Sequence, residues 1–188
     1  MNKVVSLIKD FLPAIIVTVV SVAAIVLIYT FVGGPMAIEG SSMEPVLLDG
    51  DIVIINRLAY SYDNEPQRYD LIAFEYSEDS SRKFVKRIIG MPGDVIKIED
   101  DVVYVDYGEG FVKLGEYYGY FEGEGNANLS NYGPVTVSEG EYFVLGDNRY
   151  LSKDSRFQDI GLVNADQIIG KVTFRILPLS GFGSLNYE

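Results

Sequence analysis

The 188-residue chain contains neither histidine nor cysteine. The absence of histidine excludes a Ser-His-Asp triad and every histidine-ligated metal site within this chain. The absence of cysteine excludes a thiol nucleophile, thiolate zinc sites and disulfides. We expect no metal and no cofactor, and nucleophilic chemistry would have to use a lysine or a carboxylate as its general base. A Ser-Lys pair is one known arrangement of that kind.

Basic residues are scarce as well. Fifteen lysines and arginines stand against 27 acidic residues, which gives a net charge of −12. Such a charge disfavours nucleic acid and anionic lipid headgroups as the main partner, because both are themselves negatively charged. The sequence therefore predicts that any close approach to a bilayer depends on apolar contacts.

Charge is absent altogether from residues 11–32, a stretch of 22 residues rich in valine, isoleucine and alanine. As a helix this stretch would be roughly 33 Å long, against about 30 Å for the hydrocarbon core of a bilayer. We therefore predict a single transmembrane helix over residues 11–32. A cleaved signal peptide is the alternative. Its apolar region is usually only about 7–15 residues long and ends in a small-x-small site, to which residues 33–37 are a poor match.

The positions of the first basic residues predict the orientation of this helix. Lys3 and Lys9 precede it, and no lysine or arginine occurs between Thr30 and Asn56. The positive-inside rule then places residues 1–10 in the cytoplasm and residues 33–188 outside the cell membrane. Residues 33–188 are long enough to form one domain with its own core.

The outer part is expected to be mainly β. A turn former followed by aspartate and a β-branched or aromatic run recurs along it, and no long segment has a 3.6-residue period. The apolar runs predict strands at 52–55, 71–74, 84–89, 95–98, 102–105, 142–145 and 171–176. Residues 164–169 could form a short helix. A partly closed barrel or folded sheet fits this pattern, and neither implies a function.

Residues from about 107 to 140 differ from the rest of the outer part in composition, because they are rich in glycine, tyrosine, glutamate and asparagine. We interpret them as an insertion of irregular loops and short hairpins that forms a small lobe. Its tyrosines could pack the insertion or contact a peptide, and packing is the simpler interpretation. The Asn128-Leu129-Ser130 sequon carries little weight, because that pattern is common by chance.

Lys86 is the candidate general base. An exposed lysine titrates near 10.4 and is protonated at neutral pH, whereas burial lowers the pKa by disfavouring the charged form. Strand alternation over residues 84–89 places Lys86 between the apolar side chains of Phe84 and Ile88 on one face. The alternative is a solvated lysine on an edge strand.

Ser42 is the candidate nucleophile. It lies in the segment Gly40–Pro45, about ten residues beyond the uncharged stretch. A serine at such a place is usually a turn residue or a cap. As a nucleophile, however, it would work close to the bilayer surface.

A third candidate segment, Gly146–Arg156, follows a predicted strand and is dense in polar side chains. A charged surface loop is the simpler interpretation. The alternative is an internal hydrogen-bonded network that fixes a site, because so polar a turn after a buried strand needs partners.

Together these segments resemble the bacterial type I signal peptidases, membrane-anchored Ser-Lys endopeptidases. The matching motifs are Gly40-Ser41-Ser42-Met43-Glu44-Pro45, Lys86-Arg87-Ile88-Ile89-Gly90-Met91-Pro92-Gly93-Asp94 and Gly146-Asp147-Asn148-Arg149 through Ser152-Lys153-Asp154-Ser155-Arg156, with a weaker match at Arg68–Phe74. The resemblance extends from the predicted anchor to about Pro178. It implies a β-rich catalytic domain with a variable second lobe, and the single anchor is like that of the shorter Gram-positive enzymes.

The resemblance also implies a role for each matching residue. Ser42 would be the nucleophile, with its backbone N–H in the oxyanion hole, and Lys86 the general base. Ser152 would orient the lysine amine, and the site would be supported by Asp147, Asp154 and Arg156. Residues that could line the substrate pockets are Ile38, Gly40, Met43 and Val85.

Two positions depart from the family pattern. Some members have a serine at the position of Gly40, whose hydroxyl is a second oxyanion donor. Tyr69 stands where glycine is usual, which puts the local turn in doubt.

The implied substrates are secretory preproteins, cut after small-x-small sites such as Ala-x-Ala. Three different functions would also be compatible with parts of the pattern. A self-cleaving Ser-Lys repressor shares the chemistry, but it would need a DNA-binding head. A membrane-anchored binding module would carry the same anchor without catalysis. A processing enzyme dedicated to one pilin or matrix protein would use the same dyad on a narrower substrate.

Overall fold

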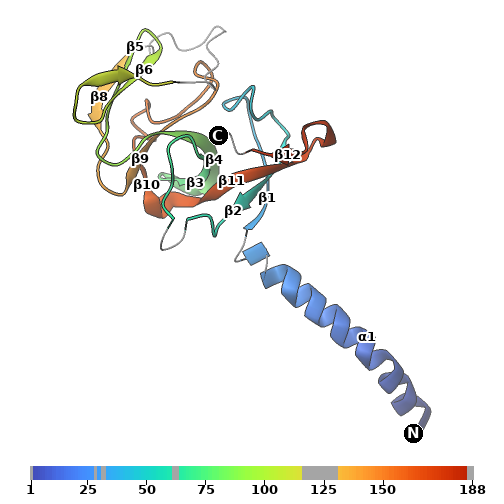
Figure 1. Ribbon diagram of the computed structural model, residues 1–188. Helices are drawn as coiled ribbons and strands as arrows, with labels where there is room; N and C mark the ends of the chain where they lie inside the picture. The colour runs from blue at the N-terminus through green and yellow to red at the C-terminus, as the bar shows by residue number, and fades with distance from the viewer. Residues whose placement is uncertain (1, 28, 31–32, 61–63, 116–130, 186–188) are drawn as a thin grey trace.

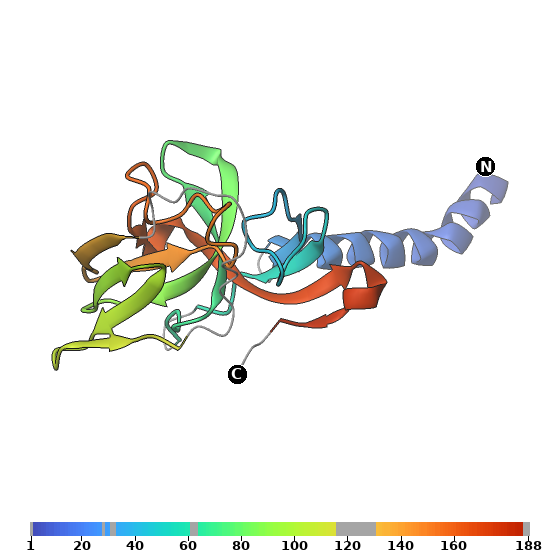
Figure 2. The same cartoon turned by 90° about the horizontal axis from the view of Figure 1, so that it is seen from above.

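The computed structural model describes residues 2–27, 29–30, 33–60, 64–115 and 131–185. It consists of one N-terminal helix, which projects away from a β-rich body built on two sheets (Figures 1 and 2). The expectation of a mainly β chain is confirmed.

Helix α1 comprises Asn2–Leu27. Its large apolar side chains from Phe11 onward are exposed. The helix therefore begins before the stretch 11–32 over which a transmembrane helix is predicted. Strand β1, Gly33–Ala37, follows that stretch, since a Gly-Gly-Pro sequence disfavours helix. In the part of the chain that the structure describes, no helix meets the length and hydropathy required of a membrane span.

The larger sheet has eight strands in the order β1-β2-β11-β3-β4-β9-β10, with β12 paired to β11. Its neighbouring strands pair antiparallel. The strands after β1 are β2 (Ile52–Asn56), β3 (Leu71–Tyr76), β4 (Asp79–Gly90), β9 (Glu141–Leu145), β10 (Val163–Asn164), β11 (Ile168–Leu177) and β12 (Gly183–Ser184).

The smaller sheet has four strands in the order β7-β6-β5-β8. Their bounds are β5 (Val95–Glu99), β6 (Val102–Asp106), β7 (Phe111–Lys113) and β8 (Tyr132–Thr136). All seven predicted strands are therefore present. The range 107–140, expected to contain irregular loops and short hairpins, contributes β7 and β8 to this sheet. Three tyrosines of the expected insertion, Tyr117, Tyr118 and Tyr120, and the sequon at 128–130 lie outside the described residues.

The described residues also form two short 3-10 helices, η3 (Ala165–Gln167) and η4 (Leu179–Gly181). The first lies within the short helix expected at 164–169, and Asn164 caps it by accepting a hydrogen bond from the Asp166 N–H.

The apolar core connects the two sheets to the candidate site. One cluster joins Ile89 and Phe143 of the larger sheet to Ile96 and Val103 of the smaller sheet. A second cluster lies beneath the loop after β1 and contains Met43. The loop of the candidate nucleophile is therefore anchored in the core, although Ser42 itself is only half-buried.

Tyr69 adopts a φ of 74°, the left-handed conformation that glycine takes most easily. The turn is nevertheless formed, because the Tyr69 N–H donates to the Ile88 carbonyl and the Asp70 N–H donates to the Gln67 carbonyl. The substitution of glycine by tyrosine thus leaves the start of β3 in place.

Candidate active site

The structure brings Ser42 and Lys86 together. Lys86 lies on β4, and Ser42 lies in the loop between β1 and β2. The lysine Nζ is 2.8 Å from the Ser42 Oγ and 3.0 Å from the Val85 carbonyl oxygen, within hydrogen-bonding distance of both. A nucleophile and a base in direct contact are the geometric requirement for activating a serine without histidine.

Burial prepares Lys86 to act as a base. Only 2% of the residue is exposed. Desolvation lowers its pKa from 10.5 to about 8, although Asp154 and Asp147 oppose the shift by stabilising the charged amine. The Phe84 ring, with its centroid 5.6 Å from the amine, contributes to this apolar setting. A usable fraction of the amine is therefore neutral near pH 7, and the alternative of a solvated lysine is excluded.

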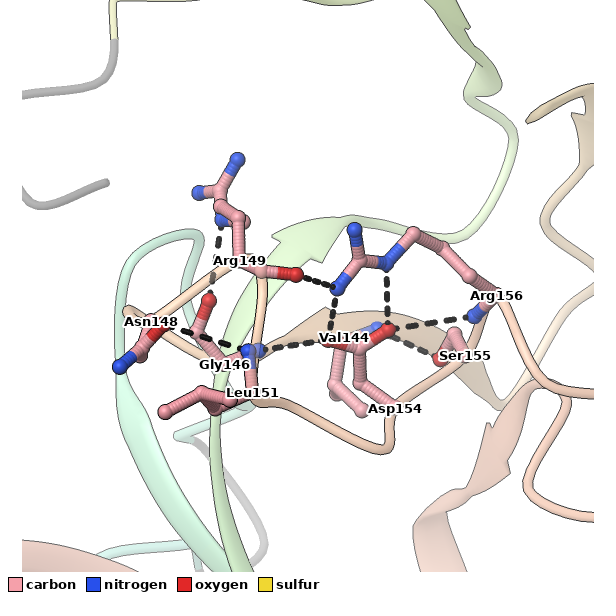
Figure 3. A network of polar contacts seen from close by, with 8 residues as sticks. All are labelled: Val144, Gly146, Asn148, Arg149, Leu151, Asp154, Ser155 and Arg156. Atoms are coloured by element: carbon pink, nitrogen blue, oxygen red, sulfur yellow. Dashed lines mark hydrogen bonds and ion pairs between the residues drawn. The ribbon is translucent and has the colours of Figure 1, made fainter. Parts of the chain in front are cut away.

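The segment after β9 forms the expected internal network (Figure 3). The Arg156 guanidinium donates to both oxygens of Asp154, at 2.8 and 3.0 Å, and also to the Arg149 carbonyl at 2.7 Å. Asp154 in turn accepts a hydrogen bond from the Gly146 N–H at 3.0 Å. Because Asp154 and Arg156 are both buried, this pair fixes the path of the loop, and the segment is not a charged surface loop.

Asp147 is held by Arg87, which lies next to Lys86 on β4. The Arg87 Nε and Nη2 donate to the two oxygens of Asp147 at 2.8 and 2.7 Å, and both side chains are at most 1% exposed. Arg87 also donates to the Tyr69 carbonyl. This bidentate pair ties the loop after β9 to the strand that bears the base.

Ser152 lies in the same buried region, but its expected hydrogen bond to Lys86 is not formed. Its Oγ is buried without a hydrogen-bond partner in the described structure. An added Cβ at Gly146 would lie 2.2 Å from this oxygen and 2.5 Å from the Ser42 carbonyl oxygen. Ser152 and the Ser42 backbone therefore approach each other across a glycine that leaves no room for a side chain.

The Ser42 backbone is fixed from the same loop. The Asn148 N–H donates to the Ser42 carbonyl at 3.1 Å. The nucleophile loop is thus held at two places, by Met43 in the apolar core and by the hydrogen bond to the loop after β9.

A cleft of about 530 Å³ opens beside the two candidate catalytic residues. Of the residues predicted to line substrate pockets, three are found on its walls, namely Ile38, Met43 and Val85, and Gly40 is not. The cleft begins at Ser42 and Lys86. One of its walls is formed by residues 36–39, at the end of β1, and the other by residues 81–86 of β4.

Gly40 is instead part of a turn. Its φ of 80° favours glycine, and its N–H donates to Asp49 Oδ1 at 2.7 Å. The Gly40 N–H is therefore occupied and does not replace the missing second oxyanion donor.

Sequence reasoning missed the functions of Arg87, Gly146 and Asn148. All three lie inside the quoted motifs, but their roles depend on partners far away in the chain, such as Asp147, which is 60 residues from Arg87. The signal in the sequence was an arginine next to the candidate base on a predicted strand, since an arginine that is buried there requires a partner.

Residues 8–177 match a family model described as signal peptidase, peptidase S26. Signal peptidase IB of Staphylococcus aureus is 35% identical over 186 residues, covering 93% of each chain. Signal peptidase I T of Bacillus subtilis is 37% identical over 167 residues, covering 86% of this chain and 83% of that protein. The crystal structure of a signal peptidase I from Enterococcus faecalis is 34% identical, covers 58% of this chain and 98% of its own, and has a TM-score of 0.46. The chain therefore belongs to the type I signal peptidases of the peptidase S26 family, which are hydrolases.

Proposed function

We propose that this signal peptidase cleaves secretory preproteins with a Ser-Lys dyad, in which Ser42 is the nucleophile and Lys86 the general base. The observation that supports this proposal best is the 2.8 Å contact between the Ser42 hydroxyl and a lysine amine that is almost fully buried. A buried amine with a pKa of about 8 can accept a proton at physiological pH, which an ordinary lysine cannot.

The reaction would take place in two steps. Neutral Lys86 accepts the Ser42 proton as the hydroxyl attacks the scissile carbonyl, giving an ester acyl-enzyme. The ammonium returns that proton to the leaving amine, and a water activated by Lys86 hydrolyses the ester. The Ser42 N–H would stabilise the oxyanion, and its orientation is supported by the Asn148 hydrogen bond to the Ser42 carbonyl.

The supporting residues would act through the loop after β9. The pair of Asp147 with Arg87 holds this loop against β4, and the pair of Asp154 with Arg156 fixes the path of the loop itself. Both carboxylates raise the lysine pKa, so they limit how far burial lowers it. Ser152 would orient the amine once substrate is bound, when its buried hydroxyl gains a partner.

The cleft suits an extended substrate that is cut after a small-x-small sequence. Among the described strands, β1 pairs only with β2, and β4 pairs with β9 only from Arg87 onward. The edges that face the cleft are therefore free to add a substrate strand. Alternate side chains of that strand would enter the apolar part of the cleft, which is lined by Ile38, Met43 and Val85 and suits small side chains such as alanine.

Two substitutions test the dyad. Ser42→Ala and Lys86→Ala, each purified as the full chain in detergent, should abolish cleavage of an Ala-x-Ala preprotein. The matched controls Ser138→Ala and Lys113→Ala alter exposed residues outside the cleft and should keep full activity. Near-normal processing by either dyad variant would overturn the proposal. Covalent labelling of Ser42 by an acylating inhibitor would distinguish an enzyme from a binding module.

We also propose that α1 holds the enzyme at the cell membrane, with its N-terminus in the cytoplasm and the β-rich body outside. The uncharged part of α1, Phe11–Leu27, is about 25 Å long at 1.5 Å per residue. Its large apolar side chains are exposed, and insertion into a bilayer would remove them from water.

Because the chain lacks cysteine, single cysteines can report the topology. Ser138→Cys should react with an impermeant thiol reagent on intact cells, and Ser6→Cys only after permeabilisation. The reverse pattern would contradict this orientation.

A further inference from the structure

Two cations that line the substrate cleft, Arg82 and Lys83, have no role in the mechanism above. Arg82 lies on the first half of β4 and lines the wall of the cleft. Its side chain is exposed. It is therefore a positive charge at the surface of a chain that is strongly acidic as a whole. Strand alternation places it on the same face as Phe84 and Lys86.

Two aromatic rings hold the Arg82 guanidinium in place. Its carbon lies 5.5 Å from the ring centroid of Tyr76 and 5.4 Å from that of Phe84. These rings contact each other edge-on, with centroids 5.4 Å apart. Since Phe84 also contacts the Lys86 amine, one ring separates the candidate base from Arg82. Stacking fixes the guanidinium and leaves its edge N–H groups available.

The platform is anchored to the rest of the body. The buried Tyr76 places its hydroxyl 2.6 Å from Asp159 and 2.9 Å from Glu78. Asp159 also forms an ion pair with Lys153, which lies over the Tyr76 ring as well. The position of Arg82 therefore depends on contacts between β3, β4 and the segment after β9, rather than on a free side chain.

Arg82 differs from the neighbouring Lys153 in its charge compensation. Lys153 is paired with Asp159, whereas neither Arg82 nor Lys83 forms an ion pair among the described residues. Lys83 does have Glu75 opposite it in the register of β3 and β4, and unlike Arg82 it is not stacked on aromatic rings there. Asp79 feels the charge of Arg82, but that carboxylate accepts its hydrogen bonds from Ser81. A positive charge held in a binding cleft without an ion pair to a described carboxylate suits an acidic ligand group.

We propose that Arg82 is a specificity-determining residue that favours an acidic side chain in the substrate upstream of the small-x-small sequence. This inference rests on the proposed function, because the pockets for the small residues set the direction of the substrate. Those pockets lie at Ile38 and Val85, so the chain before the cut extends from Lys86 toward Arg82. Four residues of strand separate these two positions by about 13 Å. Arg82 therefore faces about the fifth residue before the cut.

Peptide cleavage by the full chain in detergent tests this assignment. Three otherwise identical fluorogenic Ala-x-Ala peptides carry Glu, Gln or Lys at that fifth position, and a second set shifts the residue by one place either way. The kcat/KM for the Glu peptide should exceed that for the Lys peptide by about two- to fivefold, the range of an exposed charge pair. The ratio should fall as salt is added.

Substitutions assign the preference to Arg82. Arg82→Gln should reduce the Glu-to-Lys ratio to about one, and Arg82→Glu should invert it, while the Gln peptide reports any general loss of activity. Lys113→Gln removes an exposed cation from β7 and should leave the ratio unchanged. An unchanged ratio in Arg82→Gln, or no preference in the unaltered enzyme, would overturn the inference. If the peptides are still cut and Ser42→Ala abolishes cutting, the proposed function stands even when the preference is absent.

Discussion

Arg87 and Asp147 form a fully buried bidentate ion pair directly beside Lys86, the candidate base. Arg87 is the neighbour of Lys86 on β4, and Asp147 begins the loop that carries Asp154 and Arg156. The pair therefore links the strand of the base to the loop that surrounds it. It also places two further charges near an amine whose proton affinity matters for catalysis.

Breaking this pair should destabilise the fold. Asp147→Asn leaves the Arg87 charge buried without its carboxylate, which typically costs about 3–5 kcal/mol. Denaturant unfolding of the full chain in detergent, followed by circular dichroism, measures the loss. Glu109→Gln, which changes an exposed acidic residue in the same way, should leave stability nearly unaltered. Equal stability of the two variants would show that the pair contributes little.

Catalysis should depend on the protonation of Lys86. Because only the neutral amine can accept the Ser42 proton, kcat/KM should rise about tenfold per pH unit below the pKa of about 8 and level off above it. A pH profile measured with a peptide that does not titrate in this range checks the prediction, with circular dichroism confirming that the enzyme stays folded. A rate that continues to climb to pH 10 would mean that the lysine is not desolvated during catalysis.

The same pKa predicts a stability cost for the base. The folded-state pKa of Lys86 lies below the unfolded value, so the unfolded chain binds more protons between pH 8 and 10.5. Stability should therefore rise with pH in that window, by on the order of 3 kcal/mol in total. Lys86→Met should remove this pH dependence and be more stable than the unaltered enzyme below pH 8. If the difference in unfolding free energy between the two proteins were the same at every pH, this account would be contradicted.

Much of the fold follows from local sequence patterns. The repeated pattern of a turn former, an aspartate and an apolar run predicts the strands. The turn former and the aspartate mark a turn, and the β-branched run that follows forms the next strand. The period of two along β4 also predicts that Lys86 is buried beside Phe84, which the contact with its ring confirms. These inferences succeed because they depend only on neighbours in the chain.

Other features depend on partners that are distant in sequence. Strand β1 was not among the predicted strands, because Gly33–Ala37 has no alternating pattern of its own and forms a strand by pairing with β2. The Arg87–Asp147 pair forms only because β4 and β9 are neighbours in the sheet. The unpartnered hydroxyl of Ser152 likewise reflects packing against Gly146, which no local pattern encodes.

Gly146 should be essential for activity because it separates Ser152 from the Ser42 backbone. An alanine Cβ there would lie 2.5 Å from the Ser42 carbonyl oxygen, so the nucleophile loop must shift. A displacement of about 1 Å in an active site can reduce the rate on the order of 100-fold. We expect Gly146→Ala to lose activity to that extent in a peptide cleavage assay.

Gly140→Ala is the matched control for this substitution. Gly140 has a φ of 73°, and an added Cβ there has open space around it, so alanine strains the backbone without touching the site. Its cost of about 1–3 kcal/mol should be similar to the packing cost at Gly146. Unfolding curves should thus show comparable destabilisation, while only Gly146→Ala loses kcat/KM beyond what its folded fraction explains. If both variants lose activity in proportion to stability, Gly146 acts on the fold rather than on the position of Ser42.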